Sequence, residues 1–554
     1  MMVMFLISFA SALTEIDSCG TLDTPGETYV LNQSIFSHST CIQINANNVV
    51  LDGNGYDLIG NNSYQRGIWL NGDDHVVIKN FRNIVNMSPS YVDNFIGGIW
   101  VRNAENLTIE NITFIDNGFY DIKLENVINS SVEDINIYNK GGYGILLDEV
   151  LGVGVEDSVF SNIYIEQTDN VTSAGDIGIV LLGGSSRNTF EDIIITGHNA
   201  YDYSSGFYLG ESSNNNTIRN LTANYNDVGV YSTGVSGNIL KSVTANHNVD
   251  EGITVFASTN INLTNIIANN NSDRGVAFYS SSDGGKLYNI STSGSAQGVL
   301  FSDSSYSSMD GLTSTGNGYA GLRYYNSIWN NATNINVNSN QNGLVFDGVT
   351  GNTSILNIQS FNNSALAIKD GAGNSLKYDN SFGEINFLSP FGSDITANIT
   401  YPGTIVISDN FVEVDSANVP DLNISANVTL RGIPTNGYNY QILKNGEVCG
   451  DCVAITPLNA GTVKFEVQSW SNYSIGYDVL YSCDIYVSYD AEEDTSSDIG
   501  FNNIIVGTTG LVGNFFQYTP VMGTLFAVVI LIIVVLLIVL YVKRLSIKNS
   551  KFAG

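Results

Sequence analysis

Three charged residues, Arg102, Glu125 and Asp148, follow one another at intervals of 23 residues, and the same interval separates Trp100 from Lys123. If each interval is one turn of a stacked structure, the carboxyl groups of Glu125 and Asp148 would lie about 5 Å apart. Retaining glycosidases hold their two catalytic carboxyl groups at nearly this separation, ~5–5.5 Å. These residues are therefore the catalytic candidates if the protein is an enzyme that hydrolyses polysaccharides.

The same residues allow two other interpretations. Lys123 could act as the base of a polysaccharide lyase, with Arg102 holding a uronate. Alternatively, Arg102–Glu125 and Lys123–Asp148 are ion pairs between neighbouring strands that stabilise the fold and do no chemistry. We favour the ion-pair ladder, so enzymatic activity stays undecided, with the balance against it.

Glycines mark the repeat that must position these residues: five steps of 23 residues and one of 22 separate Gly206, Gly229, Gly252, Gly275, Gly298, Gly321 and Gly343. A short strand with alternating apolar residues follows each glycine, and most repeats carry a second alternating run. A repeat this short cannot bury a core alone, so the repeats must stack. With no helical signal between the strands, the pattern predicts an all-β protein built as a parallel β-helix.

The register extends beyond the seven glycines. Equivalent positions fall at Gly178, Gly144, Asp121, Gly98, Gly67 and roughly Cys41 on one side and at about Ala367 on the other. The sequence therefore predicts about 14 coils.

Outward-facing aromatic residues form a candidate binding stripe. Residues one and three positions after each glycine are apolar and must point inward, so those at positions two and four point outward. The outward rows contain Trp69, Trp100, Tyr208, Tyr231, Phe256 and Tyr279. Aromatic residues at positions where water favours Lys, Thr or Ser indicate ligand binding.

Three longer repeats lie beside this stripe. Their extra residues, about 84–96, 165–176 and 196–205, each end just before an outward-facing strand. They would wall one side of a groove, or they would fold over the stripe and bury it. An open row would favour binding, whereas a covered row would favour a structural role.

Composition limits the partners and cofactors. The net charge is −32, because only 21 Lys and Arg face 53 Asp and Glu, so nucleic acid is a poor partner. The four histidines lie in four different coils, and we expect no transition-metal site. The sequence assigns no cofactor and leaves calcium binding between coils open.

Both ends of the chain predict export and anchoring. Residues 1–12 are apolar and end in Ala-Ser-Ala, which is typical of a signal peptide. Residues 522–542 are long and apolar enough to cross a bilayer, and the basic tail 543–554 places the C-terminus in the cytoplasm. The acidic residues 479–521 would form a stalk. We therefore expect a single-pass protein of the cell membrane with an extracellular N-terminal part.

Five cysteines agree with an oxidising compartment. Cys19 and Cys41 flank the first coil and are expected to form one disulfide, Cys449 and Cys452 a second, tight one, while Cys483 is left over. Nineteen Asn-x-Ser/Thr sequons permit glycosylation. Asparagine also has a structural use, because it tolerates the left-handed backbone of tight corners.

The 23-residue rhythm ends near residue 380, which divides the extracellular part in two. Residues 13–380 form the predicted β-helix. Alternating strands bounded by Gly, Pro and Asn turns over residues 381–478 predict a small, β-sandwich-like antiparallel domain.

Particular segments resemble a known group. Cys19-Gly-Thr-Leu, Cys41-Ile-Gln-Ile and Val50-Leu-Asp-Gly-Asn-Gly-Tyr, followed by glycine-anchored coils, resemble the pectin-lyase-like right-handed β-helices, and among them the NosD-like (CASH) surface proteins common in archaea. The segment ending in Trp470-Ser-Asn-Tyr-Ser is similar to the β-domain that often follows such helices. The resemblance implies a right-handed helix but no single function, since this architecture hosts lyases, hydrolases, epimerases, copper-delivery factors and adhesins.

Two activities of that group do not fit the residues. Copper delivery needs clustered ligands, which the scattered histidines do not provide. A polygalacturonase-like site would need its motifs on neighbouring coils, yet Asp73-Asp74 and Gly197-His198-Asn199 are four coils apart.

We therefore expect a membrane-anchored surface protein whose β-helix binds glycans or partner surfaces. The first alternative is a polysaccharide hydrolase or lyase, and the second is a purely structural component of a surface layer or envelope.

Overall fold

The computed structural model describes residues 13–479 except 62–65, 88–96, 140, 169–175, 200–203, 349, 370–372 and 389–393. The expected signal peptide, membrane span and cytoplasmic tail lie outside the described residues, as do Cys483 and nearly all of the expected stalk. Within the described residues, no helix is long and apolar enough to cross a membrane. Contacts divide the chain into one unit of residues 1–435 and 440–476 and a second of residues 436–439 and 477–554.

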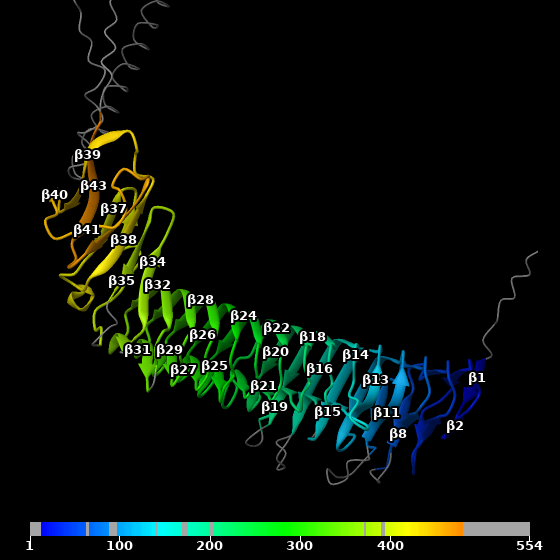
Figure 1. Ribbon diagram of the computed structural model, residues 1–554. Coiled ribbons are helices and arrows are strands. Elements are labelled where there is room, and N and C mark those ends of the chain that lie inside the picture. Colours follow the sequence, from blue (N-terminus) through cyan, green and yellow to red (C-terminus); the bar gives the residue numbers. More distant parts are fainter. Residues whose placement is uncertain are drawn as a thin grey trace, which may run out of the picture. The chain divides into compact units, whose positions relative to one another are not determined.

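The strands that follow the glycines form one parallel sheet, which we call the glycine sheet. Its neighbours are successive coils, so each strand lies beside the strand one repeat later (Figure 1). The sheet contains 15 strands: β2 (Gly20–Leu22), β5 (Ile42–Ile44), β8 (Arg66–Asn71), β11 (Gly97–Glu105), β13 (Tyr120–Ile128), β15 (Tyr143–Asp148), β17 (Ile177–Leu181), β19 (Ser205–Leu209), β21 (Val228–Thr233), β23 (Ile253–Phe256), β25 (Arg274–Tyr279), β27 (Gln297–Ser302), β29 (Ala320–Tyr325), β31 (Asn342–Asp347) and β33 (Leu366–Lys369).

The second run of each repeat forms the opposite wall, which we call the long-strand sheet. Its parallel strands are β1 (Leu13–Ile16), β3 (Thr28–Leu31), β6 (Val50–Asp52), β9 (Val77–Lys79), β12 (Thr108–Ile115), β14 (Ser131–Asn139), β16 (Val159–Gln167), β18 (Thr189–Thr196), β20 (Thr217–Asn224), β22 (Ile239–Thr244), β24 (Asn262–Asn269), β26 (Lys286–Ser293), β28 (Ser308–Thr315), β30 (Asn331–Asn338), β32 (Ser354–Phe361) and β34 (Ser375–Asp379). In the first coils this wall is split, and a separate column holds β4 (Ile35–Phe36), β7 (Asp57–Ile59) and β10 (Asn83–Val85).

The two columns merge at β12, which pairs with both β9 and β10. From β12 to β32, each long strand bends at a residue with a left-handed backbone, for example Asn111 in β12, Asn220 in β20 and Asn289 in β26. Asn adopts this conformation more readily than other residues with a side chain. The abundance of asparagine therefore has a structural reason in these bends.

The glycine row marks the closest approach of neighbouring coils. A Cβ atom on Gly298 would lie 2.5 Å from the carbonyl oxygen of Gly321 and 2.0 Å from the hydroxyl of Ser314. Every glycine of the row from Gly67 to Gly343 meets the carbonyl oxygen of the next coil in this way, at 2.5–2.9 Å. Only a residue without a side chain fits there at no cost, which explains the 23-residue rhythm.

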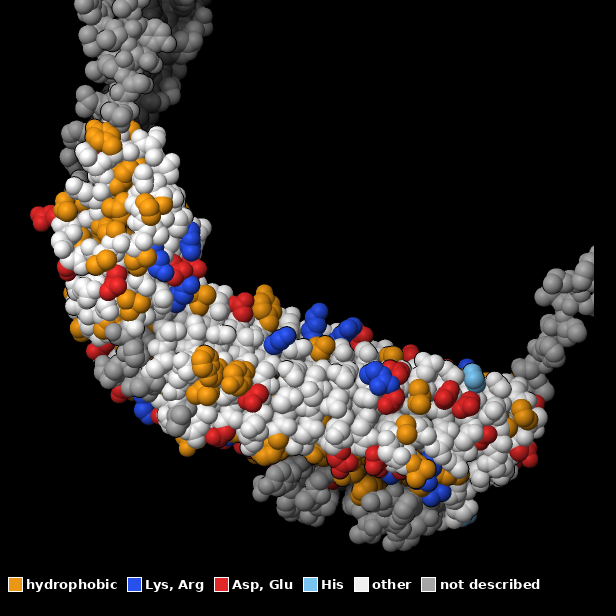
Figure 2. Space-filling view, in the orientation of Figure 1, with side chains coloured by type: hydrophobic (Ala, Val, Ile, Leu, Met, Phe, Trp, Pro, Cys, Tyr) orange, Lys and Arg blue, Asp and Glu red, His pale blue; other side chains and the backbone are white. Residues whose placement is uncertain are grey.

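Buried side chains line the inside of the coils. At the third position after the glycine, Phe278, Phe301, Tyr324 and Phe346 stack on one another with ring centroids 5.1, 5.2 and 5.6 Å apart. The face shown in Figure 2 is mostly coloured as neither hydrophobic nor charged. The apolar residues of the repeat thus gather inside, as the alternation predicts.

Buried asparagines accept hydrogen bonds from backbone N–H groups at the corner that precedes each strand of the glycine sheet. The backbone N–H of Asn226 donates to Oδ1 of Asn248 at 2.9 Å, and that of Asn248 to Oδ1 of Asn271 at 2.9 Å. The pattern continues through Ser295 and Asn317. Each coil therefore supplies the acceptor for a buried N–H of the coil before it, which would otherwise be costly to bury.

The parallel stack ends in antiparallel strands. β34 pairs with β35 (Gly383–Phe387), which continues through β38 (Ala426–Arg431) and β42 (Thr462–Val467) to β41 (Val453–Ala454). A five-stranded sheet has the order β36 (Ile405–Ser408), β37 (Phe411–Val414), β43 (Asn472–Val479), β39 (Gly437–Lys444) and β40 (Glu447–Val448). The only helix among the described residues is the single 3₁₀ turn Pro420–Leu422.

The predicted architecture is confirmed in its main parts. The described chain is an all-β, right-handed parallel solenoid of about 14 turns with a small antiparallel sheet. Both expected disulfides are present, Cys19–Cys41 and Cys449–Cys452.

The glycine row predicts a selective intolerance to one added methyl group. We expect Gly298→Ala to lower the free energy of unfolding by about 1–3 kcal/mol, because the new Cβ forces two coils apart. Gly318→Ala is the matched control: its Cβ would have no neighbour closer than 3.8 Å, so stability should stay within ~0.5 kcal/mol. Urea unfolding of both variants measures the difference, and equal stability would contradict the close-approach explanation.

The asparagine corner generates a second prediction. Asn317→Ala would remove the acceptor of the buried Ser295 N–H, which lies 3.1 Å from Oδ1, and should cost about 1–3 kcal/mol. Asn331→Ala, at an exposed position of β30, should have little effect. Hydrogen exchange at the Ser295 amide provides a local measurement, and unchanged protection there would argue against the ladder.

Candidate functional site

The outward rows of the glycine sheet have the expected register. Trp69, Trp100 and Lys123 are consecutive partners, and Tyr208, Tyr231 and Thr254 are partners further along. In the second row, Arg102, Glu125 and Asp148 are partners, and Phe256 pairs with Tyr279. The structure thus brings together the residues that the 23-residue interval selected.

The charged cluster is an internally satisfied ladder. Nε of Arg102 donates to Glu125 at 2.7 Å, and Nε1 of Trp100 donates to the same oxygen at 2.9 Å. Lys123 lies 2.8 Å from the other oxygen of Glu125 and 3.2 Å from Asp148. Both predicted ion pairs are therefore formed, with Lys123 bridging the two carboxylates.

Glu125 is held as an anion. Burial alone would raise the pKa of its carboxyl group, but the hydrogen bonds from Arg102, Lys123 and Trp100 outweigh burial and leave the pKa lowered. A carboxyl group kept ionised by three donors is poorly suited to protonate a leaving group.

The tryptophans beside the ladder are packed together. The rings of Trp69 and Trp100 lie 4.4 Å apart, and the guanidinium of Arg66 lies 4.7 Å and 4.2 Å from their centroids. Trp100 is only 2 % exposed. It therefore presents no open ring to a ligand, and Trp69 is half-buried.

The middle of the outward row is also covered. Leu146 and Val180 point away from the core of the coils, yet they are buried with Ile177 in a separate apolar cluster. Tyr143 and Tyr208 pack against this cluster from its sides. Most of the first two inserted segments expected to wall or cover the stripe lies outside the described residues, whereas residues 196–199, 204 and 205 of the third are described.

The stripe opens further along the sheet, over β19, β21, β23 and β25. A groove of about 910 Å³ is lined there by Tyr208, Tyr231, Phe256 and Tyr279, among others. Tyr208 and Tyr231 stack with centroids 5.6 Å apart at an angle of 17°, and Phe256 is 40 % exposed. In this row the large side chain of Tyr231 is followed on the next coil by the smaller side chain of Thr254, and this decrease in size leaves the hollow. We call this the tyrosine groove.

Carboxylates form the edge of the tyrosine groove. Asp227, Asp250 and Asp273 stand two positions before the glycines of three successive coils, and backbone hydrogen bonds of 2.9 Å link each to the next. Glu251 follows Asp250 and is 6 % exposed. One carboxylate oxygen each from Asp250, Glu251 and Asp273 lies within 4.8 Å of the others.

Glu251 is held by three neighbours. It accepts hydrogen bonds from Thr254 at 2.7 Å and from the Tyr279 hydroxyl at 2.5 Å, and it pairs with Arg274 at 2.7 Å. Arg274 also pairs with Asp273. The single cation of this cluster is therefore shared between two carboxylates.

Asp250 has a raised pKa. Burial raises its pKa most, and the charges of Glu251, Asp273 and Asp227 raise it further, to about 6, against the opposing charge of Arg274. A raised pKa next to ionised carboxylates is a common feature of functional sites.

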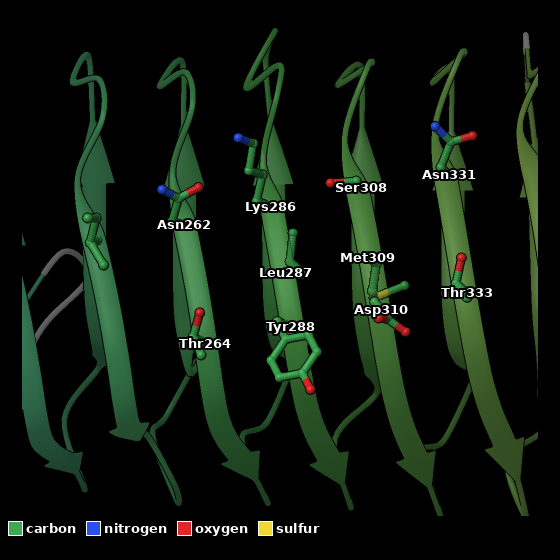
Figure 3. Close-up of a pocket in the computed structure, with 11 residues that line it drawn as sticks. Asn262, Thr264, Lys286, Leu287, Tyr288, Ser308, Met309, Asp310, Asn331 and Thr333 are labelled. Atoms are coloured by element: carbon green, nitrogen blue, oxygen red, sulfur yellow. The ribbon is translucent and has the colours of Figure 1, made fainter.

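Two other features of the described residues could bind ligands. A depression on the outer face of the long-strand sheet offers one aromatic ring, Tyr288, and one carboxylate, Asp310, lying side by side on β26 and β28 (Figure 3). Cys449, Asp451 and Cys452 have metal-ligand spacing, but both cysteines are joined in a disulfide and offer no thiolate. Neither matches the convergence of rings and acids in the tyrosine groove.

Sequence reasoning found the rings of this groove but missed its acids. Tyr208, Tyr231, Phe256 and Tyr279 were expected in the outward rows, and all four line the groove. The aspartate row has the same 23-residue interval as the charged ladder. This row lies two residues before the glycine, whereas the predicted binding stripe uses only the strand positions after the glycine.

Comparisons with known proteins agree with the fold. The family described as "Right handed beta helix region" matches residues 168–289, which include all the described lining residues of the tyrosine groove. No curated protein sequence matches the chain.

Among solved structures, the chain is similar to the A-module of a mannuronan C-5 epimerase from Azotobacter vinelandii, with 14 % identity, 61 % of this chain and 88 % of that chain covered, and a TM-score of 0.35. An E. coli bacteriophage tailspike protein in complex with a hexasaccharide is 10 % identical, with 83 % and 85 % covered and a TM-score of 0.35. An alpha-1,3-glucanase from Streptomyces thermodiastaticus is 12 % identical, with 66 % and 69 % covered and a TM-score of 0.40. The family match identifies residues 168–289 as similar to right-handed β-helix regions.

Proposed function

We propose that this protein binds glycans in the tyrosine groove and displays that groove on the outside of the cell. The observation that carries the proposal is the convergence of half-exposed rings and carboxylates over β19, β21, β23 and β25. Sugar rings present apolar C–H faces that pack on aromatic side chains, and hydroxyl groups that donate to carboxylates. The proposed membrane anchor and export signal rest on the sequence of the two termini.

The shape of the groove suits an extended chain. Its rings belong to successive coils, and coils are ~4.8 Å apart, so neighbouring rings are spaced more closely than the residues of a polysaccharide. Tyr208 and Tyr231 stack into one platform, while Phe256 and Tyr279 lie in the outer row. A glycan would thus cross several coils and contact platform and acids together.

A second candidate function is glycan cleavage in the same groove. The specific observation is the pair formed by Asp250, whose pKa is raised to about 6, and the neighbouring Glu251, which accepts hydrogen bonds from Thr254 and Tyr279. A carboxyl group with a raised pKa and a second carboxyl group beside it in one cleft are the groups that glycoside hydrolysis needs. The Arg102–Asp148 ladder is the weaker candidate, because its groups bind one another.

The groove makes a direct prediction about binding. We expect Tyr231→Ala and Phe256→Ala each to weaken glycan binding about tenfold, which corresponds to ~1.4 kcal/mol, because each removes an apolar surface under the sugar. Tyr288→Ala, an exposed ring on the long-strand sheet, is the control and should bind as well as the parent. A glycan array followed by calorimetry measures the effect; equal binding by all three folded variants would rule out the groove.

The charged ladder predicts a change in stability rather than in glycan binding. Glu125→Gln/Asp148→Asn leaves Lys123 and Arg102 without their anions, so we expect a loss of about 3–5 kcal/mol in stability. Glycan binding and any hydrolysis in the tyrosine groove should be unchanged at a temperature where the variant is folded. Abolished turnover in a fully stable variant would instead identify the ladder as an active site.

A further inference from the structure

The tyrosine groove has an unusual charge for a glycan-binding surface. Asp227, Asp250 and Glu251 line it, whereas none of its described lining residues is Lys or Arg. The nearby guanidinium of Arg274 is bound by Glu251 and Asp273 and lies 5.4 Å from the centroid of Tyr279. The groove is therefore anionic, and its neighbouring cation is engaged.

This charge decides which sugars can enter. A uronate or sulfated sugar would bring further negative charge next to three carboxylates and meet no positive partner, so repulsion would exclude it. A neutral sugar would be tolerated. A sugar that carries a protonated amine would bind more tightly, because its positive charge reduces the repulsion among the carboxylates.

The geometry fits an ammonium group. A carboxylate oxygen of Asp250 lies within 4.8 Å of one from Glu251 and one from Asp273. Glu251 and Asp273 already hold the guanidinium of Arg274, so Asp250 is the carboxylate that would accept from an ammonium N–H. Tyr208, Tyr231 and Phe256 line the same groove, and aromatic faces attract cations as well as packing on sugars. A built arrangement of rings and oxygens, rather than the acids alone, thus defines the binding position.

We propose that the tyrosine groove selects glycans bearing free, protonated amino groups, such as chains of unacetylated glucosamine, over neutral chains and against polyuronates. This selectivity rests on the glycan-binding function proposed above.

Binding should be coupled to protons. Burial and, after it, the charges of Glu251, Asp273 and Asp227 raise the pKa of Asp250 to about 6, with only Arg274 opposing them. An ammonium beside Asp250 removes much of that repulsion and lowers the pKa, so protons are released on binding near pH 6. Affinity for the amine should accordingly rise as the pH increases from 5 towards 6, and fall again where the amino group of the sugar loses its own proton.

The test is calorimetry of the full chain near pH 6 with three probes of equal length: oligomers of glucosamine, of N-acetylglucosamine and of galacturonate. We expect the glucosamine oligomer to bind at least tenfold more tightly than the acetylated one at about 50 mM salt, with a smaller advantage at about 300 mM. The galacturonate oligomer should show no binding. Heats measured in two buffers of different ionisation enthalpy should show proton release with glucosamine only.

A matched pair of variants locates the effect. Asp250→Asn keeps the size of the side chain and removes one charge, so it should reduce the advantage of the glucosamine oligomer over the acetylated one at least fivefold. Asp310→Asn, on the outer face of the long-strand sheet, should change neither.

The outcomes separate this inference from the function on which it rests. Equal, salt-independent binding of the glucosamine and acetylated oligomers would overturn the selectivity and leave glycan binding intact. Absence of binding by all three probes would overturn both. If millimolar Ca²⁺ competed with glucosamine and made galacturonate a ligand, a divalent cation would be the occupant of the carboxylates, and the amine proposal would be wrong.

Discussion

The spacing of ~4.8 Å between hydrogen-bonded coils is the constraint on which the rest of the structure depends. Where neighbouring coils approach most closely, that spacing leaves no room for a side chain, which is why glycine recurs. Where the chain turns, it places a side-chain oxygen of one coil within reach of a backbone N–H of the previous coil, so asparagine and serine line the corners. The same spacing converts a 23-residue interval in the sequence into direct contact in space.

Contacts between neighbouring coils have opposite consequences in the two charged clusters, around Glu125 and around Asp250. Around Glu125, charges of both signs occupy neighbouring coils, so each charge has a partner within the cluster. Around Asp250, neighbouring rungs repeat the same sign, and a single arginine cannot compensate for all of them. A protein retains such uncompensated charge at a cost in stability, and sites with a ligand to accommodate are where this cost is usually found.

The sequence was sufficient to predict the register, because a repeat fixes which residues share a row before any coordinates exist. The partners of Trp69, Glu125 and Tyr208 could all be read by adding the repeat length. It was not sufficient to predict exposure. Trp100 and Tyr231 occupy the same outward row, yet one is buried by Trp69, Arg66 and Glu125 and the other lines a groove. Burial depends on what neighbouring rows and connecting segments place over a position, and that information is not periodic.

The buried asparagine and serine ladders run towards the following coil, whereas the part-buried ladder through Asn269, Asn246 and Asn224 runs the other way. The N–H groups of Asn226, Asn248 and Asn271 find their acceptors on the following coil, as do those of Ser258 and Ser282 at the opposite corner. A coil is therefore complete only once its successor has been laid upon it. During synthesis, which proceeds from the N-terminus, the newest coil always presents unsatisfied donors to the segment that emerges next. The stack therefore grows by adding coils at its C-terminal end, and the antiparallel pairing of β34 with β35 ends that growth.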